Sequence, residues 1–375
     1  MSKVITNQPE GNQVVSTNIG SDGTLTFGQA FSTQGNGLHG VTDPNGPDPL
    51  FAQGAVKVSP AAQALIAVNP GSNTVSMFSI DPNDPSSLTL VGTPADSQGE
   101  FPMSLAFNKA GTMACVLNGG KVNGVGCFSV DAKQGLVAMA NSVRPLGLNQ
   151  TTPPAGPAGT TSHVIFSEDE TKLIASVKGV PPTPGFLATW DIAADGTLSQ
   201  NFTQSTPSAG GLLPFSMTVI PGKNAVLATD AGIGFDIFDF SKGSSASSSI
   251  VPINGQGATC WSSFSKQTGN FYLTDIDTAT VTEVNVDANL KGSIVKQYPQ
   301  GKGSGTIDNE IATIGGNDFM YVLGANATQI DVLSLNAPGQ AKGVQTFDLA
   351  APAKAAGVTI DPFNLQGMTA FVKAA

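Results

Sequence analysis

The chain has 375 residues, of which 12 % are charged and 40 % are hydrophobic, and its formal net charge is −10. This length suits two average domains or one large all-β domain. The negative charge argues against nucleic acid as a partner, because polyanions bind basic surfaces. No apolar run approaches the roughly 20 residues that cross a bilayer, so no membrane partner is expected.

One unit recurs along the chain: a short apolar strand, a polar turn, a second apolar strand, a turn rich in Gly, Asn or Asp, and a third strand. Six explicit copies occupy residues 54–81, 103–131, 162–192, 215–240, 260–287 and 309–335. A fourth strand is plausible after most copies, as at residues 88–94 and 136–142. No segment keeps a 3.6-residue period, so few helices are expected.

Four short strands at this spacing are typical of a β-propeller blade. A seventh blade can be assembled from two strands in residues 356–372 and two in residues 13–30. Joining both ends in one blade closes the ring and leaves no long exposed edge strand. The sequence therefore predicts one all-β domain over residues 1–375, a seven-bladed β-propeller of four-stranded antiparallel blades. A parallel β-helix is the alternative, but its repeats are much shorter.

The cysteines and the Asn-x-Ser/Thr sequons bear on the compartment. Cys115 and Cys127 flank residues 116–126, which read as a hairpin, so they either form a disulfide across it or are two small buried residues. No CxxC occurs, so the usual zinc spacing is absent. Together with a low Lys content, the sequons at Asn149, Asn201 and Asn326 favour a secreted glycoprotein. The N-terminal residues lack an apolar signal core, so the chain is either cytosolic or a mature form with a start Met restored.

Several stretches resemble the lactonase-like seven-bladed propellers, which include 6-phosphogluconolactonases and carboxymuconate-cyclizing enzymes. They are "NPGSNTVSMFSID" (69–81), "GEFPMSLAFNKAG" (99–111), "LLPFSMTVIPGKNAVLATDAG" (212–232) and "TCWSSFSKQTGNFYLTDIDTATV" (259–281). The resemblance implies the fold over nearly the whole chain but is a poor guide to the reaction. The chain also resembles a secreted fungal branch, which implies a hetero-Diels–Alderase of secondary metabolism.

The sequence departs from the cyclizing enzymes at their charged residues. Those enzymes carry a His-x-His at the entry to one inner strand, and here only His163 matches, with Thr161 in the first position. Where family members have an Arg-His pair in the next blade, this chain has Phe215 and Ser216. These departures argue against muconate cycloisomerisation and simple lactone hydrolysis.

The innermost strand of each propeller blade lines the central tunnel, so the repeat alignment predicts the site. One inner column contains Ala55, Ser104, His163, Ser216, Trp261 and Glu310. The column before it contains Gly54, Met103, Ser162, Phe215, Cys260 and Asn309. We expect both columns at the tunnel mouth, with Phe101 and Asp308 near its rim.

His163, Ser104, Ser216 and Glu310 are the candidate catalytic residues. His163 has three interpretations: a general acid or base, a hydrogen-bond donor to a ligand carbonyl, or a structural histidine. Ser104, His163 and Glu310 lack a nucleophile-elbow pattern, so a hydrolase triad is disfavoured.

The other candidates are predicted to bind substrate. Phe101, Met103, Phe215 and Trp261 suggest an apolar lining, unless they serve inter-blade packing. Ser162, Asn309 and Asp308 add polar contacts. His39 lies in a Gly/Pro-rich loop that is long enough to cover the tunnel as a lid, although a plain surface role is the favoured alternative.

Three hypotheses for function follow. The first is a cofactor-free cyclase that positions a small hydrophobic substrate and polarises it by hydrogen bonds, as in a hetero-Diels–Alder cycloaddition. The second is a lactone hydrolase or muconate-type cycloisomerase that uses His163. The third is a non-catalytic secreted propeller that binds a partner. Asp308 and Glu310 could ligate Ca²⁺, but no dense acidic cluster accompanies them, so no metal is expected. The sequence does not predict an oligomeric state.

Overall fold

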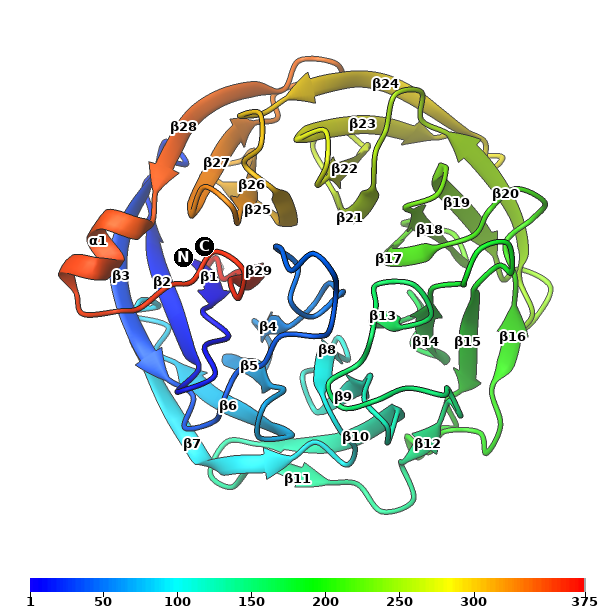
Figure 1. The fold of residues 1–375 in the computed structure, drawn as a ribbon, viewed down its shortest axis with the longest axis horizontal. Helices are drawn as coiled ribbons and strands as arrows, with labels where there is room; N and C mark the ends of the chain where they lie inside the picture. The colour runs from blue at the N-terminus through cyan, green and yellow to red at the C-terminus, as the bar shows by residue number, and fades with distance from the viewer. Residues whose placement is uncertain (374–375) are drawn as a thin grey trace.

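A computed structural model describes residues 1–373, which form a ring of seven antiparallel β-sheets around a central axis (Figure 1). The prediction of a seven-bladed propeller is confirmed. Blade 1 contains β4 (Val56–Ser59), β5 (Ala64–Asn69), β6 (Thr74–Ile80) and β7 (Leu88–Asp96). Blade 2 contains β8 (Pro102–Phe107), β9 (Met113–Asn118), β10 (Gly124–Asp131), β11 (Gly135–Ala138) and the short β12 (Arg144–Pro145).

The next four blades each have four strands. Blade 3 contains β13 (Thr161–Phe166), β14 (Lys172–Val177), β15 (Phe186–Asp191) and β16 (Thr203–Ser205). Blade 4 contains β17 (Pro214–Val219), β18 (Ala225–Asp230), β19 (Gly234–Asp239) and β20 (Ser247–Pro252). Blade 5 contains β21 (Thr259–Phe264), β22 (Phe271–Asp275), β23 (Thr280–Val286) and β24 (Gly292–Pro299). Blade 6 contains β25 (Thr306–Ile314), β26 (Asn317–Gly324), β27 (Gln329–Ser334) and β28 (Lys342–Asp348).

Blade 7 joins the two ends of the chain in one sheet. It contains β29 (Gln366–Ala370), β1 (Ser2–Ile5), β2 (Gln13–Ile19) and β3 (Leu25–Ser32), in that order from the axis outward. The ring closure was predicted, but the division of two strands from each end is wrong. Residues 350–355 form the helix α1 (Ala350–Ala355) and turns follow it, so the C-terminal segment supplies one strand and the N-terminal segment three. Within the described residues, no helix is long and apolar enough to cross a membrane.

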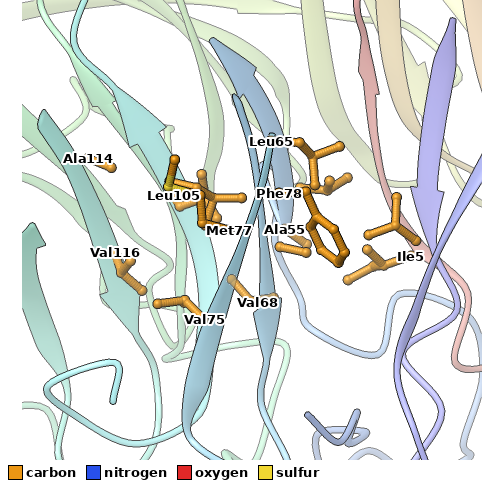
Figure 2. Packing of buried hydrophobic residues seen from close by; sticks show 14 of the residues in the cluster. Ile5, Ala55, Leu65, Val68, Val75, Met77, Phe78, Leu105, Ala114 and Val116 are labelled. Carbon is orange, nitrogen blue, oxygen red and sulfur yellow. The ribbon is translucent and has the colours of Figure 1, made fainter. Parts of the chain in front are cut away.

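The hydrophobic core lies between neighbouring blades. Figure 2 shows one such contact, where Ile5 of blade 7 and Leu105 of blade 2 flank the buried residues Ala55, Leu65 and Phe78 of blade 1. The second strand of blade 1, β5, is buried along its whole length, because sheets cover both of its faces. The outermost strands β20, β24 and β28 are mostly exposed. Packing therefore holds the inner strands rigidly, which suits them to carry a site.

Candidate functional site

A segment of the chain runs inside the tunnel at its centre. Residues 48–54, which we call the plug, precede β4 and lie in the middle of the ring (Figure 1). The Gln53 side chain exchanges two hydrogen bonds with the backbone of Ser262, at 3.0 and 3.1 Å. The Trp261 indole N–H and the Gln366 amide both donate to the carbonyl oxygen of Ala52. In the loop predicted as a lid, Val41, Thr42 and Asp43 line a cavity of the tunnel, and the residues after the loop enter the tunnel as the plug. Its closure over the tunnel stays a prediction.

A buried lysine that follows β14 binds the plug to blade 3. The Lys178 ammonium donates to the carbonyl oxygens of Phe51, at 2.7 Å, and Thr161, at 3.0 Å, and to the Ser162 hydroxyl. Its nitrogen also lies 4.4 Å from the centre of the Phe215 ring. Burial lowers the pKa of Lys178 to about 7, against the opposing attraction of Asp48. Burial likewise raises the pKa of Asp48 to about 7, with Lys178 opposing the shift.

The plug separates two cavities that share no lining residue. The His163 cavity, of about 510 Å³, lies toward the ends of the inner strands and contains Gln53 of the plug. The Trp261 cavity, of about 660 Å³, lies toward their starts and contains Asp48 and Phe51 of the plug. Both volumes suit a small organic ligand. The predicted single site at one mouth is thus divided between two chambers.

A shared β-bulge aligns the inner strands and corrects the repeat alignment. In blades 2–6 the pairing of the first two strands shifts register at one equivalent place, for example between Thr161 and Val164 and between Thr306 and Asn309. When positions are counted from this bulge, Asp308 of blade 6 takes the place that His163 has in blade 3. Glu310, which the repeat alignment put in that place, lies two residues further along the strand. A slip of two residues keeps the alternation of side chains, so periodicity alone could not reveal it.

His163 is fixed as a neutral hydrogen-bond donor. The Met217 backbone N–H donates to His163 Nδ1 at 3.0 Å, so that nitrogen carries the lone pair and Nε2 carries the proton. The side chain is 4 % exposed, and burial, aided by the positive charge of Lys57, holds its pKa well below the usual value. Nε2 is buried without a partner among the described residues. Of the three interpretations, this geometry favours the donor.

Two other predicted residues line the His163 cavity. Asn309 has a buried side-chain oxygen that finds no partner in the described part of the chain, and so does the cavity residue Ser263. Glu310 Oε2 lies 3.7 Å from Lys57 Nζ, and both side chains are half-buried. Burial raises the pKa of Glu310, and the charge of Lys57 opposes that rise. Lys57 was not among the predicted site residues, although it lies in the inner strand of blade 1 and the repeat pattern could have placed it there.

The predicted serines are all engaged in structural hydrogen bonds. Ser104 Oγ donates to the carbonyl oxygen of Gln53 at 2.6 Å and accepts from the Val164 N–H. Ser216 Oγ lies 3.0 Å from the Thr229 hydroxyl and 2.9 Å from the Ser262 hydroxyl. Ser162 accepts from Lys178. These hydroxyls connect blades and plug, and none is poised as a nucleophile.

The remaining predicted residues are distributed elsewhere. Phe215 and Trp261 line the Trp261 cavity and contact each other edge to face, with centroids 5.1 Å apart. Phe101 and Met103 are fully buried in the core around blade 1, so Phe101 is not near the rim. Asp308 is also buried away from the rim, where it accepts hydrogen bonds from Gln366 and from the Gly367 N–H. Both ring nitrogens of His39 lie close to carbonyl oxygens of its own loop, those of Gly40 and Gly46.

The cysteines and sequons are also placed. Cys115 and Cys127 face each other across β9 and β10 and are joined by a disulfide, the first of the two alternatives. Asn149, Asn201 and Asn326 are all exposed.

Comparisons with known proteins match the first part of the chain to one family. Residues 10–151 match the family described as "Lactonase, 7-bladed beta-propeller". A search of curated protein sequences found no significant match. Among solved structures, the periplasmic gluconolactonase of Pseudomonas aeruginosa superposes with a TM-score of 0.65 at 17 % identity, over 93 % of this chain and 97 % of that chain.

A second solved structure is similar over nearly the whole chain. A provisionally named 6-phosphogluconolactonase of Bacteroides fragilis gives a TM-score of 0.64 at 14 % identity, over 98 % of this chain and 96 % of that one. At such identities these structures show the shared fold alone. The resemblance to lactonase-like seven-bladed propellers is confirmed by the family match over residues 10–151, and the solved structures confirm the fold.

Proposed function

We propose that this lactonase-like seven-bladed propeller is a cyclase, which binds a small hydrophobic carbonyl compound in the His163 cavity and catalyses its cycloaddition. The observation that carries the proposal is the buried N–H of His163 Nε2, which has no partner within residues 1–373. A buried donor without a protein partner is costly unless a bound molecule satisfies it. A carbonyl oxygen is the acceptor that it would take.

The walls of the cavity support chemistry by positioning. Its apolar lining comes from the inner strands and the turns after them and includes Leu105, Phe107, Ile165, Met217 and Phe264. The charged residues Lys57, Lys109, Glu168, Glu170 and Glu310 also line it. Holding two reactants in reactive geometry can supply on the order of 7–11 kcal/mol in the best model systems. A preorganised donor to an oxygen that gains negative charge adds roughly 3–4 kcal/mol. A hetero-Diels–Alder reaction of an unsaturated carbonyl compound with an alkene needs only these two contributions and no cofactor.

Lactone hydrolysis is a second candidate, and Glu310 is the observation that favours it. A carboxylate whose pKa is raised is a better general base toward water. In this scheme Glu310 activates water, and the His163 N–H stabilises the tetrahedral oxyanion. His163 itself is a poor base here, because Met217 occupies Nδ1 and the proton occupies Nε2.

The two reactions are separated by assaying purified protein with an o-quinone methide plus an alkene, and with a panel of lactones. The cyclase proposal predicts rate acceleration over buffer that His163→Phe reduces by about 10²-fold and that Glu310→Gln leaves nearly intact. The hydrolase alternative predicts lactone turnover that Glu310→Gln abolishes. His39→Gln, outside both cavities, serves as the matched control. A rate and product ratio equal to buffer in both assays would refute catalysis and favour a binding propeller.

We also propose that the protein enters the secretory pathway and is glycosylated. The disulfide suits an oxidising compartment, and the three sequon asparagines are accessible to a transferase. Endoglycosidase treatment of protein from a eukaryotic secreting host should lower its apparent mass, and an unchanged mass would contradict glycosylation.

A further inference from the structure

The second chamber, the Trp261 cavity, is separate from the proposed reaction site and has a different chemical character. Its body is built from aromatic and aliphatic side chains together with proline rings, including Phe51, Leu213, Phe215, Trp261 and Ile276. It lies on the opposite side of the plug from His163, so a ligand here does not contact the proposed catalytic donor.

The side-chain N–H donors that line this cavity are already used. The Trp261 indole donates to the carbonyl oxygen of Ala52 at 3.1 Å. The three protons of the Lys178 ammonium point to Phe51, Thr161 and Ser162. A carboxylate or phosphate ligand would therefore lose its hydration without finding an N–H donor among these side chains, which disfavours anions.

Acceptors, in contrast, remain free at the rim. Asp43 and Asp277 line the cavity and are exposed. Within residues 1–373, neither carboxylate accepts a protein hydrogen bond or pairs with a cation. Asp48, a third acidic lining residue, is buried, accepts from the Ala52 N–H and interacts with the charge of Lys178, the cation that lines the cavity. Asp48 therefore balances Lys178 and leaves Asp43 and Asp277 as the free carboxylates. The chain as a whole carries a net charge of −10, which reinforces the local negative potential.

From this arrangement we infer that the Trp261 cavity is a binding site for an amphiphilic organic cation, namely a compact apolar skeleton that carries one ammonium group. The skeleton fills the aromatic chamber, and the ammonium lies at the rim against Asp43 and Asp277. This inference does not depend on the proposed cyclase reaction, because it concerns the other chamber.

Three probes of one shape test the inference by isothermal titration: 1-adamantylammonium, 1-adamantanol and 1-adamantanecarboxylate. We expect the ammonium to bind at least tenfold more tightly than the alcohol, and the carboxylate to bind most weakly. The double variant Asp43→Asn/Asp277→Asn should bring the ammonium and the alcohol to within about threefold of each other. Asp195→Asn, an exposed carboxylate in a distant turn, is the matched control and should leave the preference unchanged.

Two further variants locate the bound probe. Ala258→Phe adds a ring to the wall of the Trp261 cavity and should abolish binding, whereas His163→Phe in the other chamber should not weaken it. Circular dichroism of Ala258→Phe checks that it folds. The inference is overturned if the alcohol binds as tightly as the ammonium, if the rim variants leave the preference intact, or if none of the probes binds wild-type protein.

Discussion

At the scale of single residues, His163 is defined by one backbone contact. The Met217 N–H fixes the tautomer, and burial keeps the ring neutral. In the unfolded chain His163 titrates near pH 6.5, so below that pH the unfolded state binds a proton that the folded state does not. Folding stability from this residue is therefore fully present above pH 6.5 and is lost as the pH falls further.

This pH dependence of folding stability should differ measurably between wild type and a variant without His163. Between pH 6.5 and pH 5, we expect the stability of His163→Asn to fall less steeply than that of wild type, with a limiting difference of about 1.4 kcal/mol per pH unit. Urea unfolding of both proteins at several pH values measures this difference. Parallel pH dependences would mean that His163 titrates normally in the folded state.

Gly54 holds open the space that the His163 ring occupies. Its φ is +89°, which disfavours any side chain, and an added Cβ would lie 2.9 Å from Ser104 Oγ and 3.2 Å from His163 Nε2. We expect Gly54→Ala to lower stability by about 1–3 kcal/mol and to reduce turnover by displacing the ring. Thermal unfolding and the cycloaddition assay measure the two effects. Gly46→Ala, in the same loop with open space around it, should be nearly neutral.

At the scale of elements, the plug determines how the tunnel is divided into two cavities. Lys178 binds it to blade 3, while Gln53 and Trp261 bind it to blade 5. Lys178→Met would leave buried carbonyl oxygens without donors, at about 1–3 kcal/mol for each unpaired group. We expect a lower unfolding temperature and faster hydrogen exchange at residues 51–54. The exposed Lys302→Met is the control, and equal behaviour of the two variants would show that Lys178 does not fasten the plug.

At the scale of the whole molecule, the ring depends on β29. This strand pairs with β1, and Gln366 within it reaches Ala52 of the plug and Asp308 of blade 6. Truncation after Asn364 removes the innermost strand of blade 7 and should abolish cooperative unfolding. Calorimetry and size-exclusion chromatography test this expectation. Truncation after Val372 keeps β29 and should behave like wild type.

Much of the fold was predictable because each blade repeats a local pattern. Alternating apolar residues and turn residues lie within some 30 positions of each other, so they can be recognised without tertiary information. The inner column was also predictable, apart from Asp308, where a slip of two residues preserves the pattern. Lys178 and Asp48 were missed, because nothing in their local sequence marks them as buried charges.

The sequence by itself determined the seven blades, their closure through both termini, and the single imidazole of the inner column. Only the tertiary structure decided that the loop before blade 1 enters the tunnel, divides it into two chambers and accepts the hydrogen bond of Ser104. The reason is the range of the contacts. The plug is held by Ser262, 209 residues from Gln53, and by Gln366, 314 residues from Ala52. Such distant partners leave no periodic trace in the sequence, whereas strands and turns are encoded by near neighbours.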